Sequence, residues 1–317
     1  MKKRILAILL ELTMLLGMFT SVSAYAVAAG KNSPEISTKI IEWSDIRAEI
    51  KWGAELFAQP SNVYNKDLAF ASIVLSKAAS GKRSQKMESL GFQNFYQYCE
   101  PSARELPSFT IAEQTWIING EETALITIIL EGTGSALAQW KNNFNIFKVP
   151  YYGYAVHFGF KAYADEMWNA LVAFLSENQD LPAKKKLLIT GHSAGGAGAN
   201  LLTARLNLDA EQTIACKDDV YTYTFATPNV YNGKEADASK FNNIFNIINT
   251  SDIVPQLPPS HVWHKFGRIL SFTSSNEAEP HSINVHLRHL PDAEFTDGKH
   301  KITLALLVEW IVENFRM

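Results

Sequence analysis

The chain has 317 residues, of which 47% are hydrophobic and 19% are charged. This balance is typical of a folded globular protein and excludes a disordered chain. The formal net charge of −3 gives no indication of a basic surface for nucleic acid. A chain of this length can form one large α/β domain as readily as two ordinary domains.

The first residues predict an export signal. A basic run at positions 2–4 precedes an apolar stretch at 5–19, and small residues that suit a signal peptidase follow. The stretch is short for a membrane span and is interrupted by Glu11, which is unusual in a signal sequence. We expect a signal peptide over 1–28, export from a bacterium, and one domain over 29–317, with a buried N-terminal helix as the alternative.

The segment that follows the predicted signal peptide is expected to be mostly helical and to form a cover. Between Glu35 and Ser80, residues recur at roughly helical spacing. They are Ile40, Ile41, Trp43, Ile46 and Ile50, followed by Leu68, Ala69, Ala71, Ser72 and Leu75. From Phe109 the pattern changes to strands, over 115–118 and 124–130, joined by a turn at Asn119-Gly120.

Strands and helices then alternate to the end of the chain. The expected elements are a helix over 163–177, a strand over 186–190, a helix including 200–206, strands over 220–225 and 244–249, and a closing helix over 302–315. This alternation predicts an α/β fold with a mostly parallel central sheet and helices on both faces.

The sharpest motif is Gly191-His192-Ser193-Ala194-Gly195, which directly follows the strand over 186–190. A Gly-x-Ser-x-Gly segment between a strand and a helix rich in small residues is the context of a nucleophile elbow. Glycines let the strand and the helix approach closely, and the serine hydroxyl is exposed at the carboxyl edge of the sheet. Ser193 is therefore the candidate nucleophile.

Five ordered segments between about residues 110 and 290 resemble the class 3 lipase family, the fungal-type triacylglycerol lipases and their bacterial relatives. The segments are Leu130 to Thr133, Val156 to Phe160, the elbow, Tyr223 to Pro228, and Asn249 to Pro258. The resemblance implies an α/β-hydrolase fold. Two positions depart from the family, which usually has Arg in place of Glu131 and Gly in place of Ala226. The first departure changes the charge beside the family's oxyanion hole.

A serine hydroxyl needs a base, and the base needs a carboxylate to orient it. Asp252 follows the strand over 244–249 and matches the family's Asp-Ile-Val-Pro element. His281 resembles the histidine of a His-Ser-Met-x-x-Tyr-Leu pattern in bacterial members and lies in a loop before a helix. Three other histidines stay open as the base, namely His300, His286 and His289.

The oxyanion of an acyl-transfer reaction needs two N–H donors. The backbone N–H of Ala194 is one candidate, and the resemblance implies Thr133 as the other. Ser135 to Asn145 occupies the place of the family's amphipathic lid, although a plain helix packed on the core would give the same pattern.

These residues predict a carboxylic ester hydrolase that works through an acyl-enzyme on Ser193, without a metal or an organic cofactor. The resemblance implies a lipase that acts on acylglycerol esters and contacts a lipid interface transiently. A feruloyl-type esterase or a phospholipase would use the same residues, and a non-catalytic ligand-binding homologue is the rival from another class. Cys99 and Cys216 are expected to be separate buried thiols rather than a disulfide.

Overall fold

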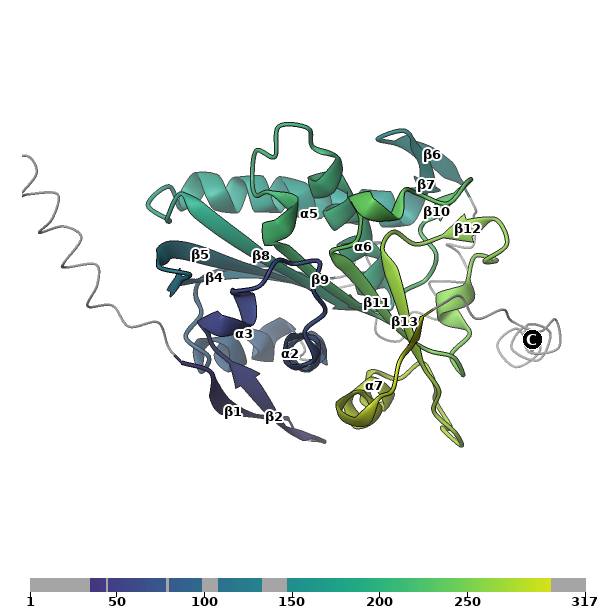
Figure 1. The fold of residues 1–317 in the computed structure, drawn as a ribbon, viewed down its shortest axis with the longest axis horizontal. Helices are drawn as coiled ribbons and strands as arrows, with labels where there is room; N and C mark the ends of the chain where they lie inside the picture. The colour runs from purple at the N-terminus through teal and green to yellow at the C-terminus, as the bar shows by residue number, and fades with distance from the viewer. Residues whose placement is uncertain (1–34, 44, 78–79, 99–107, 133–146, 298–317) are drawn as a thin grey trace, which may run out of the picture.

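The computed structural model describes residues 35–297 except 44, 78–79, 99–107 and 133–146. Its centre is an eight-stranded sheet with the order β14-β13-β11-β9-β8-β5-β4-β3 (Figure 1). The strands are β3 (Gln93–Tyr98), β4 (Phe109–Ile118), β5 (Glu121–Leu130), β8 (Lys184–His192), β9 (Val220–Phe225), β11 (Ile244–Asn249), β13 (Arg268–Phe272) and β14 (Thr296–Asp297).

The middle of this sheet is parallel. Strands β5, β8, β9, β11 and β13 pair in parallel with one another, whereas β4 and β3 at one edge and β14 at the other are added in antiparallel pairing. The carboxyl ends of β8 and β11 therefore lie on one edge of the sheet, which is where α/β proteins place their functional groups.

Helices cover both faces of the sheet (Figure 1). On one side lie α5 (Phe158–Glu177) and α6 (Ala194–Leu208), and on the other lie α2 (Lys66–Lys77), α3 (Ser80–Glu88) and α7 (Ile283–His289). Strand β5 is buried on both faces because its side chains alternate between two cores. Ile126, Ile128 and Leu130 pack with α5 and α6, whereas Leu125 and Ile129 pack with α2. The predicted α/β class with helices on both faces is confirmed.

The N-terminal segment corrects one prediction. The helical expectation holds for α2, but β1 (Ser37–Glu42) and β2 (Arg47–Trp52) form an antiparallel hairpin. In β2 the residues alternate between exposed and buried, and Ala48, Ile50 and Trp52 face inward. The buried residues of β2 thus recur every second residue, which is the period of a strand, and in so short a segment this period is easily confused with a helical one.

A second, small sheet was not predicted. It has the order β12-β10-β7-β6 and consists of β6 (Lys148–Tyr151), β7 (Tyr154–His157), β10 (Tyr231–Asn232) and β12 (Trp263–His264). Short 3-10 helices complete the described chain, namely η1 (Ala54–Phe57), η2 (Lys217–Asp219), η3 (Ala238–Lys240), η4 (Val254–Gln256) and η5 (Leu290–Asp292). The rings of Tyr154, Tyr231 and Phe266 pack together with centroids 4.3 to 5.5 Å apart; Tyr231 stacks on Phe266, and Tyr154 meets both rings edge to face.

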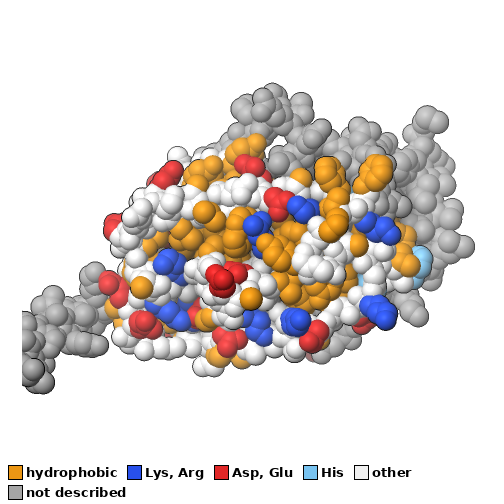
Figure 2. Space-filling model, turned by 90° about the horizontal axis from the view of Figure 1, so that it is seen from above, with side chains coloured by type: hydrophobic (Ala, Val, Ile, Leu, Met, Phe, Trp, Pro, Cys, Tyr) orange, Lys and Arg blue, Asp and Glu red, His pale blue; other side chains and the backbone are white. Residues whose placement is uncertain are grey.

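The surface seen from above in Figure 2 shows apolar side chains among scattered charges. On α5 and the β6–β7 hairpin the exposed large apolar side chains are Tyr152, Phe158 and Val172. Within the described ranges, none of the helices combines the length and the apolar character that crossing a membrane requires. The predicted closing helix over 302–315 lies outside the described residues.

A buried ionic cluster lies at the amino ends of β8 and β9. Asp219 Oδ1 accepts a hydrogen bond of 2.7 Å from Lys186 Nζ, and Asp219 also pairs with Lys184. Cys216 is a free thiol that donates to Asp219 Oδ2 at 2.8 Å, and it is half-buried rather than buried as expected, while Cys99 lies outside the described residues. This cluster is at the opposite end of β8 from Ser193. The parallel-centred sheet, the two helical layers and the sharp turn between β8 and α6 together make an α/β-hydrolase fold.

Candidate active site

Ser193 occupies the turn between β8 and α6 with φ of 58° and ψ of −124°, a backbone conformation that residues other than glycine rarely adopt. Its backbone N–H donates to the carbonyl oxygen of Phe225 at 2.9 Å, which fixes the turn to β9. A Cβ atom on Gly191 would lie 2.4 Å from the carbonyl carbon of Gly195, and one on Gly195 would lie 2.3 Å from the carbonyl oxygen of Leu130. The glycines of the motif are therefore required for strand and helix to approach each other.

The structure brings together the three residues predicted as nucleophile, base and acid. His281 Nε2 lies 2.9 Å from Ser193 Oγ, and His281 Nδ1 lies 2.7 Å from Asp252 Oδ2. Asp252 is buried, and the His281 side chain is 28% exposed. With Nδ1–H donating to the carboxylate, Nε2 has its lone pair directed at the serine hydroxyl, which is the arrangement that activates a nucleophile.

The loop after β11 positions Asp252. Its Oδ1 accepts a hydrogen bond of 2.9 Å from the Val254 N–H, so the second oxygen remains available to the histidine. The fully buried Asn249 donates from Nδ2 to Ser274 Oγ at 2.7 Å and to the Pro280 carbonyl at 3.2 Å. Asn249 thus connects the loop of the acid to the loop of the base. The sequence motif contained this residue, but its role as a connection between two distant loops required the structure.

The other candidate bases have different surroundings. His286 is fully buried in α7, and burial lowers its pKa to about 4. Its ring contacts that of His192, which in turn lies 5.1 Å from the ring of His281, so these side chains pack behind the candidate base. His289 Nε2 lies 2.8 Å from Glu277 Oε1 on the surface. Of the described histidines, His281 is the one that contacts Ser193, and His300 lies outside the described residues.

The candidate oxyanion hole is described in part. Ala194 is the first residue of α6, and N–H groups in the first turn of a helix have no acceptor within the helix. Gly132 lies against the nucleophile, since a Cβ atom on it would be 3.4 Å from Ser193 Cβ and 2.8 Å from the His192 carbonyl oxygen. Thr133 and the segment Ser135 to Asn145 lie outside the described residues, so the second donor and the lid stay predictions.

The two departures from the family pattern have structural explanations. Glu131 Oε1 accepts a hydrogen bond of 2.9 Å from Nη2 of the buried Arg83, so its charge beside the candidate oxyanion hole is paired. The expected change of charge at this place is therefore offset by a residue from a distant helix. Ala226 has a φ of 50°, in the left-handed region that favours glycine, which accounts for the family's usual residue there.

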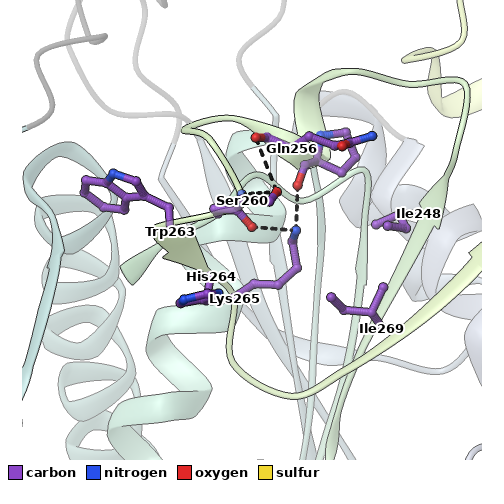
Figure 3. Close-up of a pocket in the computed structure, with 9 residues that line it drawn as sticks. Ile248, Gln256, Ser260, Trp263, His264, Lys265 and Ile269 are labelled. Atoms are coloured by element: carbon purple, nitrogen blue, oxygen red, sulfur yellow. Dashed lines mark hydrogen bonds between the residues drawn. The ribbon is translucent and has the colours of Figure 1, made fainter. Parts of the chain in front are cut away.

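A small cavity with a mixed polar and apolar lining lies beside the loop that follows Asp252 (Figure 3). The buried Lys265 donates from Nζ to Asn229 Oδ1 at 2.9 Å and to the Pro255 carbonyl at 2.6 Å. Asn229 Nδ2 donates to the Pro258 carbonyl at 2.7 Å. These bonds hold the loop over 254–260 in place. No group of three or more His, Cys, Asp or Glu residues suited to a metal ion occurs among the residues that the structure describes.

Comparisons with known proteins find similarity to lipases in the region that contains the nucleophile elbow and Asp252. Residues 127–262 match the family model described as lipase (class 3). The chain is 30% identical to a lipase of Rhizomucor miehei over 149 residues, which are 45% of this chain and 40% of that protein. It is 32% identical to the toxin TseL of Vibrio cholerae over 113 residues, which are 35% of this chain and 16% of that protein.

The matched segments thus span well under half the length of these two relatives. Among solved structures, a Rhizomucor miehei lipase in complex with its propeptide aligns with 79% of this chain and 80% of its own, at 21% identity and a TM-score of 0.49. The family match covers Ser193 and Asp252 and ends before His281. Over residues 127–262 this chain is therefore similar to the class 3 lipases.

Proposed function

We propose that this protein is a carboxylic ester hydrolase that cleaves acylglycerol esters through an acyl-enzyme on Ser193. The observation that carries the proposal is the chain of contacts from Asp252 through His281 to Ser193 Oγ, at 2.7 and 2.9 Å. The distance of 2.9 Å between His281 and Ser193 suits proton transfer from a nucleophile to its base, and the distance of 2.7 Å between His281 and Asp252 is that of a hydrogen bond which orients the base.

The chemistry proceeds in two halves. Ser193 Oγ attacks the ester carbonyl while its proton moves to His281 Nε2, and Asp252 stabilises the resulting imidazolium. The tetrahedral oxyanion accepts a hydrogen bond from the Ala194 N–H at the start of α6. His281 then gives its proton to the departing alcohol, and the acyl-enzyme forms. Water, deprotonated by His281, attacks the acyl group and releases the carboxylic acid and the serine hydroxyl.

The acylglycerol substrate is supported by two observations. The chain is similar over 149 residues to a fungal protein named as a lipase. Apolar side chains are also exposed at the start of α5 and beside it, with Phe158 57% and Phe147 64% exposed. Such side chains can contact the acyl chains of an aggregated substrate.

The test is hydrolysis of p-nitrophenyl esters from acetate to palmitate by the wild type and by Ser193→Ala. We expect activity that increases toward long acyl chains and a loss on the order of a millionfold in kcat on substitution. A fluorophosphonate probe should label the wild type and leave Ser193→Ala unlabelled. Activity confined to acetate and butyrate would contradict the lipid substrate, and a wild type that neither hydrolyses any ester nor reacts with the probe would contradict the enzyme.

The proposal includes export. The basic and apolar composition of residues 2–19 supports a signal peptide over 1–28 and a mature domain over 29–317. N-terminal sequencing of protein recovered from the culture medium of a bacterial host should give a mature chain that starts near residue 29. Retention in the cytoplasm with an intact Met1 would contradict export.

A further inference from the structure

Arg83 is one of the largest fully buried side chains in the described part of the chain, and the others in this group are aromatic. It lies in α3, and its guanidinium contacts acceptors on two strands of the central sheet and on the residue that follows one of them. Nη2 donates to Glu131 Oε1 at 2.9 Å, and Nη1 lies 3.3 Å from the Ile129 carbonyl oxygen and 3.4 Å from Thr110 Oγ1. A single planar group thus connects β4, β5 and the residue that follows β5.

The segment held by Arg83 is in contact with the nucleophile turn. A Cβ atom on Gly195 would lie 2.3 Å from the Leu130 carbonyl oxygen and 2.7 Å from that of Glu131. Gly132, the next residue, lies against the His192 carbonyl and the side chain of Ser193. Because these backbone atoms are in close contact with no free space between them, a displacement of the end of β5 would also displace the Ser193 turn.

A second side chain holds the same strand end from the other face of the sheet. Tyr163 of α5 donates from its hydroxyl to the Ser108 carbonyl at 2.9 Å and lies 3.4 Å from the Glu131 carbonyl. Figure 1 shows α3 and α5 on opposite sides of the sheet. The end of β5 is thus fixed from both faces, by a guanidinium on one and a phenol on the other.

Burying the charge of Arg83 beside a partly buried glutamate costs desolvation energy, and apolar residues of similar size often stabilise a fold as well or better. The pair has a property that apolar packing lacks, because the guanidinium fork fixes both the direction and the distance of its acceptors. Its acceptors belong to the strand end that contacts Ser193, which points to a role in catalytic geometry.

We propose that Arg83 is a positioning residue for ester hydrolysis, which holds the carboxyl end of β5 against Ser193 through Glu131 and Ile129. The inference rests on the proposed function. Glu131 is the side chain through which Arg83 acts, so its charge serves as an anchor for the strand end.

The test compares Arg83→Met, Glu131→Gln and the double variant with the wild type, on a p-nitrophenyl ester that the wild type hydrolyses. We expect kcat to fall about ten- to a hundredfold in each variant, since a displacement near 1 Å can cost about a hundredfold. KM should change less than about twofold, because the Arg83 side chain is buried and out of reach of a substrate. The inhibition constant of an alkyl boronic acid, which forms a tetrahedral adduct on the serine, should rise by the same factor as kcat falls.

The double variant keeps the test valid if a single substitution prevents folding, because it removes both charges and leaves neither buried alone. It should retain the reduced kcat, since the connection is still missing. The matched control is Arg47→Met, which removes an arginine that is 56% exposed and pairs with Glu42 and Glu49. It should leave kcat and the boronic acid affinity unchanged.

A kcat at the wild-type level in the folded double variant would overturn the positioning role, and so would a KM increase without a kcat decrease. These results leave the proposed function intact, since the wild type would still hydrolyse the ester and Ser193→Ala would not. A wild type that hydrolyses no ester would overturn the proposed function and this inference together.

Discussion

Gly195 has no space for a side chain, and substitution by alanine tests whether this close contact supports the nucleophile. Gly195 is the second residue of α6, where a Cβ atom would lie 2.3 and 2.7 Å from the carbonyl oxygens of Leu130 and Glu131. Both obstacles are backbone atoms, so neither can move aside by rotating a side chain. The helix and the strand end would have to separate.

The expected loss of stability is the difference between two effects. Forcing a methyl group into a packed site costs about 3 kcal/mol when the neighbours cannot adjust. Replacing glycine by alanine in a helix contributes about 1 kcal/mol in the opposite direction. The net destabilisation is about 2 kcal/mol, which lowers the melting temperature of a domain of this size by roughly 4–8 °C. A separation near 1 Å at the Ser193 turn should lower kcat about a hundredfold.

The matched control is Gly159→Ala. Gly159 is the second residue of α5, and a Cβ atom there would lie 3.5 Å from the nearest atom, His157 Cε1, which is an ordinary contact. Thermal unfolding followed by circular dichroism and ester hydrolysis at 25 °C should show an unchanged or slightly more stable control with wild-type kcat. If Gly195→Ala behaves in the same way as Gly159→Ala, the argument from close contact is wrong.

Three further predictions concern the acid, a buried histidine and the ionic cluster. Asp252→Asn should lower kcat about 10⁴-fold with little change in melting temperature, because His281 loses the partner that sets its tautomer; a loss below tenfold in steady-state hydrolysis would contradict this role. Burial holds the pKa of His286 at about 4, below 6.5, so protons bind the unfolded state preferentially as the pH falls between these values and the folded state loses stability. Urea unfolding should therefore show that the free energy of unfolding falls between pH 7.5 and pH 5 by about 2 kcal/mol more in the wild type than in His286→Phe. Equal decreases in the two proteins would refute the lowered pKa of His286. Asp219→Asn leaves the buried Lys186 without this carboxylate and should destabilise the fold by about 3–5 kcal/mol, with unchanged kcat below the unfolding temperature; a reduced kcat in folded protein would contradict the separation of this cluster from the site.

Much of the parallel core could be predicted from the sequence. The expected strands over 220–225 and 244–249 coincide with β9 and β11, because continuous runs of buried, β-branched and aromatic residues are bounded by polar turns. The turn between β4 and β5 was also predicted, since Asn119 and Gly120 both adopt positive φ, of 53° and 84°. These signals are local, and neighbouring residues suffice to produce them.

Features that depend on distant partners were not predictable in the same way. The β1–β2 hairpin was mistaken for helix because a short apolar pattern fits both periods. Nothing near Glu131 in the sequence identifies Arg83 as its partner, 48 positions away. For the site, the elbow indicated Ser193, and a family pattern indicated Asp252 and His281. Only the fold shows that Asn249 connects the two loops that carry the acid and the base.

The N-terminal elements have a consequence for the smallest unit able to fold. Tyr221 of β9 donates its hydroxyl to the Phe57 carbonyl at 2.8 Å, and Lys77 of α2 donates to Asn284 of α7, three residues after His281, at 2.7 Å. The segment 127–262, which matches the class 3 lipase model, therefore lacks both the candidate base and the surface that packs beneath its strands. An excised fragment with these limits would expose the underside of β8 and β9 to water and should aggregate. The segment that matches the family is therefore smaller than the unit that we expect to fold on its own.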